Sequence, residues 1–361
     1  MDVGTASQTL VLPGQPVVLP ANREIPPEVS VAIRHLPKAE LHTHLQGCCP
    51  GSLWSAHYGE TPGFDDFSGL MRAYDEVSAA LYRAGVSIFE LLRAVVNQAQ
   101  ANHARYIEPA LSASHLESDI VAVGLPVMAQ RLRQAAEQAA SRGVHVGLMI
   151  MAHRHNPPEV VRRHMQIGLA LAAAGAPVVS VGCAGGGNLT TLEQWGRIWD
   201  ELGGRSQLPL VPHAGELVPG AETFEDLHDA LGVMPRRIAH GVQAVLEPEL
   251  LSYLAAHQIC CDVAISSNEL LGNTAASQHP IVTMVRAGVP CSINTDDSLL
   301  LGCSLNSEYE LAWGQGLSLR ELLACAQHSV RHGGAGPLVR RRILQEQARW
   351  AHRFGRLLQT R

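Results

Sequence analysis

Short apolar runs alternate with longer helical stretches over most of this chain, and this alternation limits the folds open to it. Eight runs look like buried parallel strands, at residues 38–44, 105–111, 144–151, 177–183, 208–213, 237–240, 259–264 and 290–295. Amphipathic or Ala-rich stretches predict helices at residues 124–142, 158–175, 190–202, 222–232, 246–256, 278–287, 304–314 and 338–358. Such a pattern predicts an α/β fold, the (β/α)₈ TIM-type barrel.

The ends of this pattern indicate the domain organisation. Residues 1–30 contain several prolines and no helical period, so we expect an extended N-terminal arm. Residues 31–361 then form a single barrel domain, because α/β barrels of this length are commonly one domain. The stretch 51–104 is too long for one crossover, which predicts extra helices between the first two strands.

Composition favours a small-molecule ligand. The formal net charge is −6, basic residues are scattered, and aromatic residues make up 4% of the chain, so we expect no nucleic-acid partner. No segment approaches the roughly 20 apolar residues of a membrane span, so we expect no membrane partner. The N-terminus lacks the order of a signal peptide. We therefore expect a cytoplasmic protein, while the oligomeric state stays open.

The lysine and cysteine content excludes several kinds of chemistry. Lys38 is the only lysine, and it lies near the base of the first predicted strand. A Schiff base, a P-loop clamp or a carbamylated lysine between two metals would have to use this poorly placed residue. The eight cysteines form no C-x-x-C, which argues against a disulfide framework or a thiolate zinc site.

Five residues able to bind a metal or move protons stand at the carboxyl ends of predicted strands: His42, His44, His213, His240 and Asp296. His42 and His44 are two residues apart, so both imidazoles point to the same side of one strand. In barrel enzymes the carboxyl ends of the strands carry the chemistry. Three imidazoles and one carboxylate suit one Zn²⁺ per chain, with an open position for water.

Glu216 follows His213 by three residues on a turn that contains glycine. It can therefore reach the same pocket without binding the metal, and as a protonated acid it could donate to a substrate nitrogen. His240 and Asp297 would complete the set of proton-carrying groups. A metal that lowers the pKa of bound water to about 7 would supply the nucleophile.

Four segments resemble signature segments of the adenosine deaminase family within the amidohydrolase superfamily. They are PKAELHTHLQG at 37–47, HAGE at 213–216, RIAHG at 237–241 and NTDD at 294–297. The resemblance implies that zinc is held by His42, His44, His213 and Asp296. It implies that His240 orients or deprotonates the attacking water and that Glu216 protonates the purine nitrogen beside the reacting carbon. The Gly185 amide and the Asp297 carboxyl would bind the other ring nitrogens.

The implied reaction is zinc-dependent hydrolytic deamination at C6 of an adenine-type purine nucleoside or derivative. The chain departs from the family on the substrate side. Gln46 stands where the family has an acidic residue at the ribose end, and the turn at 182–187 lacks the usual acids beside Ala-Gly. These departures favour an adenine-like substrate that differs from plain adenosine, such as a 5′- or N6-modified derivative that releases ammonia or an amine.

Two other hypotheses remain open at this stage. One is a barrel metallohydrolase that cleaves another C–N bond or an ester or lactone. A ring-nitrogen proton donor such as Glu216 is needed for deamination but not for opening a lactone. The other is a catalytically silent family member that binds a nucleoside, although nothing in the sequence shows decay of the metal site.

Overall fold

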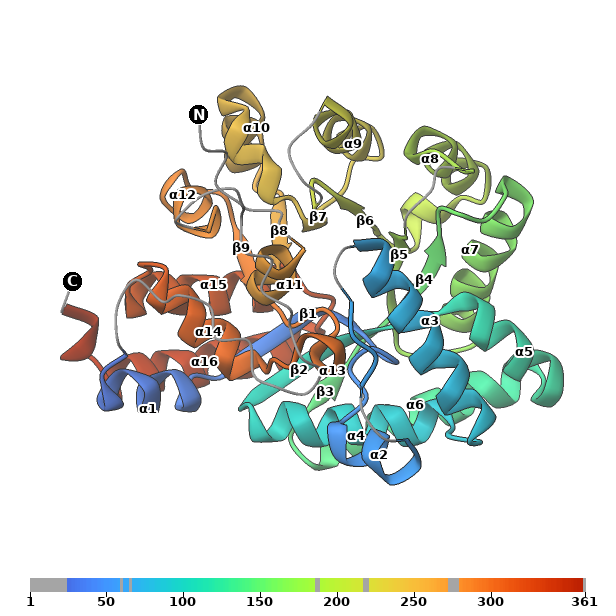
Figure 1. Ribbon diagram of the computed structural model, residues 1–361, viewed down its shortest axis with the longest axis horizontal. Coiled ribbons are helices and arrows are strands. Elements are labelled where there is room, and N and C mark those ends of the chain that lie inside the picture. Colours follow the sequence, from blue (N-terminus) through green and yellow to red (C-terminus); the bar gives the residue numbers. More distant parts are fainter. Residues whose placement is uncertain are drawn as a thin grey trace, which may run out of the picture.

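A computed structural model describes residues 25–58, 61–64, 67–185, 189–216, 221–271 and 279–359. Strands occupy its centre and helices surround them (Figure 1). The strands are β1 Lys38–His44, β2 Ala104–Ser112, β3 His145–Val146, β4 Leu148–His153, β5 Val178–Ala184, β6 Leu210–Ala214, β7 Arg237–His240, β8 Cys260–Val263 and β9 Cys291–Ile293. Each predicted strand is present, and the run at 144–151 is divided into β3 and β4 at Gly147.

All strand pairs are parallel, in the order β1-β2-β4-β5-β6-β7-β8-β9, and β3 pairs with β2. A parallel bridge between Thr43 and Asp296 brings the chain after β9 back to β1. The His44 amide donates to the Asp296 carbonyl at 3.0 Å, and the Asp296 amide donates to the His42 carbonyl at 3.2 Å. These contacts close the (β/α)₈ barrel that the sequence predicts.

Helices follow the strands and cover the barrel. They are α1 Pro27–His35, α2 Gly51–His57, α3 Phe67–Arg83, α4 Ile88–Ala101, α5 Ala113–Val123, α6 Leu125–Ser141, α7 Pro158–Ala173, α8 Leu192–Glu201, α9 Ala221–Gly232, α10 Pro248–Ala256, α11 Ile265–Leu270, α12 Ile281–Arg286, α13 Ser298–Leu301, α14 Leu305–Gly314, α15 Leu319–His332 and α16 Pro337–Arg353. The expected extra helices between the first two strands are α2, α3 and α4. No helix of the described ranges is long and apolar enough to cross a membrane.

The start of α1 differs from the predicted domain boundary. The arm was expected to extend to residue 30, but helix α1 begins at Pro27. Proline is well suited to the first turn of a helix, where its fixed φ fits and its missing N–H removes no hydrogen bond. The expected arm at 1–24 lies outside the described residues.

The side chain of Lys38 stabilises the fold at the start of β1. Its ammonium is buried at the start of β1 and donates to the carbonyls of Ile33, Leu36 and Asn102, at 2.7, 3.0 and 3.2 Å. These bonds tie the end of α1 and the loop before β2 to the foot of the barrel. Lys38 lies six residues before His44, at the opposite end of β1 from the carboxyl ends.

Candidate active site

The five strand-end residues predicted from sequence meet at the carboxyl face of the barrel. His42 and His44 come from β1, His213 from β6 and His240 from the end of β7. Asp296 follows β9 by three residues and is placed by its bridge to Thr43. Segments more than 250 residues apart in sequence are thus joined by the closure of the barrel rather than by local structure.

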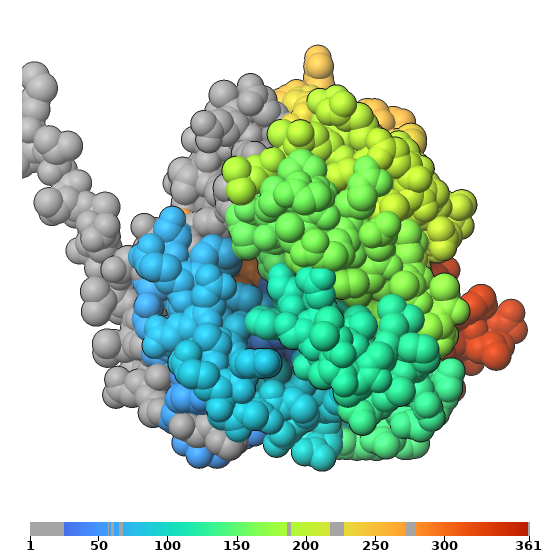
Figure 2. Space-filling view, turned by 90° about the vertical axis from the view of Figure 1, so that its right-hand side faces the viewer, coloured from blue at the N-terminus to red at the C-terminus, as the bar shows by residue number. Residues whose placement is uncertain are grey.

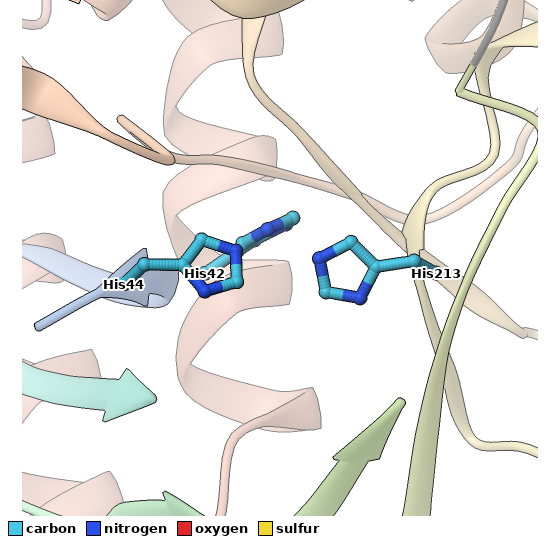
Figure 3. Close-up of side chains that lie close together, drawn as sticks. All are labelled: His42, His44 and His213. Carbon is cyan, nitrogen blue, oxygen red and sulfur yellow. The ribbon is translucent and has the colours of Figure 1, made fainter. Parts of the chain in front are cut away.

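The imidazoles form a compact cluster. The ring centroid of His42 lies 4.7 Å from those of His213 and His240 and 5.4 Å from that of His44. Figure 3 shows the rings of His42, His44 and His213 grouped together, with His213 reaching across from a separate strand. The potential ligand atoms of these three side chains all lie within 4.8 Å of one another.

Asp296 joins this cluster through one carboxylate oxygen. Its Oδ1 lies 3.3 Å from His42 Nε2 and 3.2 Å from His44 Nε2. Burial alone would raise the pKa of Asp296, but the imidazoles of His42 and His44 hold it well below its ordinary value. Asp296 and His240 both have left-handed backbones, with φ of 59° and 66°. Such conformations are uncommon for residues other than glycine and concentrate at functional sites.

The free nitrogens of the cluster fit a metal. His213 Nδ1 lies 2.7 Å from the Cys183 carbonyl and His42 Nδ1 lies 3.4 Å from the Asp262 carbonyl. These contacts leave Nε2 of each ring buried and without a hydrogen-bond partner in the described chain. A backbone carbonyl on one imidazole nitrogen is the usual way of aiming the other nitrogen at a metal. With the Asp296 carboxylate, the donor set is one that zinc accepts.

Glu216 lies next to this cluster on a turn that requires glycine. Gly215 has φ of 64°, and a Cβ there would approach Leu227 Cδ1 to 2.7 Å. Glu216 Oε1 lies 3.4 Å from His240 Nε2 without forming a hydrogen bond. Burial, followed by the Asp296 carboxylate, raises the pKa of Glu216 well above its ordinary value. Burial also lowers the pKa of His240 to about 3. The site thus pairs a carboxyl whose pKa is raised with an imidazole whose pKa is lowered.

Asp297 lies against the turn that follows β1. A Cβ at Gly47 would overlap the Asp297 carboxylate, so no larger residue fits there without moving this side chain. Burial and the Asp296 carboxylate raise the pKa of Asp297 to about 7. Cys48 supports the same region: its thiol donates to the Asp296 carbonyl at 2.9 Å. Cys48 therefore stabilises the backbone of Asp296 by a hydrogen bond.

A cavity of about 480 Å³ opens onto these groups. Its lining includes His44, His213, Glu216, His240, Asp296, Asp297, Ala184, Gly185, Ser112, Ser114, His115, His153, His155, Ser68, Leu70, Met71, Tyr74 and Asp75. Figure 2 shows this face hollowed between the light-blue segment that contains α3 and the green and teal segments opposite. The predicted substrate residues Gly185 and Asp297 line the cavity, whereas Gly186 and Gly187 lie outside the described residues.

Gln46 lies beside two residues of the cavity lining. Gln46 is buried, and it lines a neighbouring cavity together with His115 rather than this one. Contact with the substrate stays a prediction for Gln46. Its Nε2 lies 3.1 Å from His115 Nδ1, and its Oε1 accepts from the Tyr74 hydroxyl at 3.2 Å. Gln46 therefore contacts two residues of the cavity wall.

Sequence reasoning missed the imidazoles of His115, His153 and His155. His153 ends β4 and His155 follows it by two residues, which is the same spacing that singled out His42 and His44. The signal was therefore present, but the strand was expected to end at residue 151. His115 lies on α5, a helix that sequence reasoning also missed.

Ser267 and Asn268 position two of the site residues from α11. The Ser267 hydroxyl donates to Asp296 Oδ2 at 2.8 Å, and the Asn268 amide nitrogen lies 3.4 Å from His240 Nδ1. Glu308 fixes the start of α11, since its Oε2 accepts from the amides of Ile265 and Ser266 at 2.8 and 3.1 Å. A buried carboxylate on α14 thus anchors the short helix that orients the metal cluster.

Replacing Ser267 with alanine should weaken metal binding about 10- to 100-fold, the usual cost of removing a hydrogen-bond partner from a metal ligand. The reason is that Asp296 Oδ2 loses its donor. Competition with a metallochromic chelator measures the change. Ser329→Ala is the matched control, because this buried hydroxyl donates to the Cys325 carbonyl within α15 and contacts no member of the cluster. Equal metal affinities in the wild type and Ser267→Ala would contradict the assigned role.

The barrel and its cluster define a class of protein: the metal-dependent barrel hydrolases, in which imidazoles and a carboxylate meet at the carboxyl ends of the strands. The family model described as adenosine deaminase matches residues 52–350. The chain belongs to the adenosine deaminase family and is a hydrolase.

A curated relative supports this assignment, and solved structures share the fold. The chain is 33% identical over 303 residues to a protein named adenine deaminase from Rhizobium leguminosarum bv. trifolii, covering 77% of this chain and 88% of the relative. The crystal structure of adenine deaminase from Arthrobacter aurescens superimposes with a TM-score of 0.75 at 22% identity, covering 88% of this chain and 99% of that one. An amidohydrolase from Burkholderia ambifaria with bound Zn gives a TM-score of 0.75 at 18% identity, covering 97% and 99%.

Proposed function

We propose that this protein is a zinc-dependent hydrolase that removes the 6-amino group of adenine itself. The observation that carries the proposal is the convergence, on one cavity, of a metal-type donor set and a buried carboxyl with a raised pKa. The names of the curated relatives, which are adenine deaminases, support the free base as substrate. The sequence predicts an adenine-like substrate that differs from adenosine, and the proposal narrows that class of substrates to adenine.

In this proposal His42, His44, His213 and Asp296 hold one Zn²⁺. The bound ion would act as a Lewis acid and make water a nucleophile at neutral pH. Neutral His240, aimed at the cluster, accepts a proton from the attacking water. The remaining steps fall to Glu216 and to the residues that hold the ring.

Glu216 donates its proton to the ring nitrogen next to C6. A proton on that nitrogen makes C6 a better electrophile, and a carboxyl with a raised pKa suits this role. The amino group then takes the proton that His240 received from the water and leaves as ammonia, while the new hydroxyl returns a proton to Glu216. The Gly185 amide and Asp297, both on the cavity wall, bind the other ring nitrogens. A lactone-opening enzyme would have no use for a ring-nitrogen donor, and a silent binder would have no need of a complete donor set.

A substrate panel tests the proposal. Zinc-replete protein is incubated with adenine, adenosine, 5′-modified adenosines and N6-substituted adenines, and amine or ammonia release is measured together with the ultraviolet change of the ring. We expect adenine to give a kcat/KM within the range of roughly 10⁴–10⁸ M⁻¹s⁻¹ typical of efficient enzymes. Silence across the panel with zinc bound would overturn the proposal.

A further inference from the structure

The cavity contains a second group of imidazoles that the proposed chemistry does not use. His115, His153 and His155 line it, and none of them belongs to the potential metal clusters of the described residues. The rings of His153 and His155 stack with centroids 5.2 Å apart and planes at 17°. Both come from the end of β4 and the turn that follows it. They form a pair, here called the β4 histidine pair.

The β4 histidine pair borders Gly185. A Cβ at position 185 would lie 3.3 Å from His155 Nδ1 and 3.6 Å from His153 Nδ1. The opposite nitrogen of His153, Nε2, lies 3.3 Å from the Ser112 hydroxyl. That contact occupies one side of the His153 ring, so its Nδ1 is the nitrogen left on the Gly185 side. Two imidazole nitrogens therefore flank the residue whose amide is proposed to bind the purine ring.

The geometry of the adenine ring indicates which substrate atom would lie beside the β4 histidine pair. This inference rests on the proposed function, in which Glu216 meets N1, and it further assigns the Gly185 amide to N3, which leaves N7 to Asp297. N3 and N9 lie on the same edge of a purine, so groups that border the N3 contact also border N9. Free adenine can carry a hydrogen on N9, whereas a nucleoside carries a sugar there. A neutral imidazole nitrogen can accept that hydrogen.

We propose that the β4 histidine pair accepts the N9 hydrogen of a free purine base and so selects the base over N9-substituted purines. Neither imidazole of the pair belongs to the potential metal clusters of the described residues. The pair is therefore a determinant of specificity rather than a second metal site.

The test compares adenine, 9-methyladenine and adenosine as substrates of zinc-replete wild type, His153→Leu and His155→Leu. In the wild type we expect kcat/KM for adenine to exceed that for 9-methyladenine by at least about 100-fold, since sites built to bond a substrate N–H reject analogues without it. In one or both variants we expect kcat/KM for adenine to fall by about tenfold, and kcat/KM for 9-methyladenine to stay unchanged. His145→Leu is the control, because His145 lies on β3 outside the described cavity lining.

The possible results separate this inference from the proposed function. A wild type that deaminates adenosine or 9-methyladenine as efficiently as adenine would overturn the inference while leaving purine deamination intact. Variants that lose activity equally on all three substrates, or that keep the wild-type ratio, would also overturn it. Failure of the proposed function looks different, because no purine would then release ammonia even from the wild-type enzyme.

Discussion

Replacing Glu216 with glutamine is expected to lower kcat by about 100-fold or more, the scale on which positioned acids contribute to catalysis. Glutamine keeps the size and hydrogen-bonding shape of the side chain but has no carboxyl proton to deliver. Burial and the neighbouring carboxylates raise the pKa of Glu216, so we expect the substitution to remove a proton donor without removing a negative charge. Steady-state ammonia release from adenine measures kcat.

The control for Glu216→Gln is Asp75→Asn. Asp75 lines the same cavity, and the change is again from acid to amide, but Asp75 belongs to α3 and to none of the described metal clusters. We expect Asp75→Asn to keep kcat within about tenfold, which is below the contribution of a positioned acid. Both variants should bind as much zinc as the wild type. A Glu216→Gln enzyme with nearly wild-type turnover would remove Glu216 from the mechanism.

The barrel could be predicted because parallel strands that are buried on both faces leave an apolar run in the sequence. The observed patterns of β7, β8 and β9 are buried at every residue. Helix α15 was missed although Ser318 and Glu321 form a capping box at its start. That signal was readable, because a serine followed three residues later by glutamate is typical of a helix N-terminus.

The metal-type cluster could be predicted because each of its members lies near the carboxyl end of a strand or shortly after it, and the barrel topology then brings them together. The environment of the substrate could not be predicted in the same way. For Gln46, no local pattern shows that its amide contacts Tyr74 and His115, two residues of the cavity wall. Ser267 and Asn268 reach the site only because Glu308 on α14 holds α11, and no local pattern encodes that long-range contact.

Replacing Asp296 with alanine is expected to reduce zinc affinity by more than the roughly 10- to 100-fold that loss of a ligand's hydrogen-bond partner costs. Asp296 Oδ1 is the atom shared by His42 Nε2 and His44 Nε2, so its removal opens the cluster on one side. After dialysis the variant should hold well under one zinc per chain by atomic absorption, and its turnover should fall with the metal content.

Asp297→Ala is the matched comparison for Asp296→Ala, because the two carboxylates are adjacent in sequence and equally buried. Asp297 also has an oxygen close to His44 and Asp296, so the geometry alone would allow it to bind the metal. The proposed roles assign it to the substrate instead. We therefore expect Asp297→Ala to keep its zinc and lose turnover, whereas Asp296→Ala loses both. If Asp297→Ala lost the metal and Asp296→Ala kept it, the fourth ligand would be Asp297, and the carboxyl assigned to the purine ring would have to be sought elsewhere on the cavity wall.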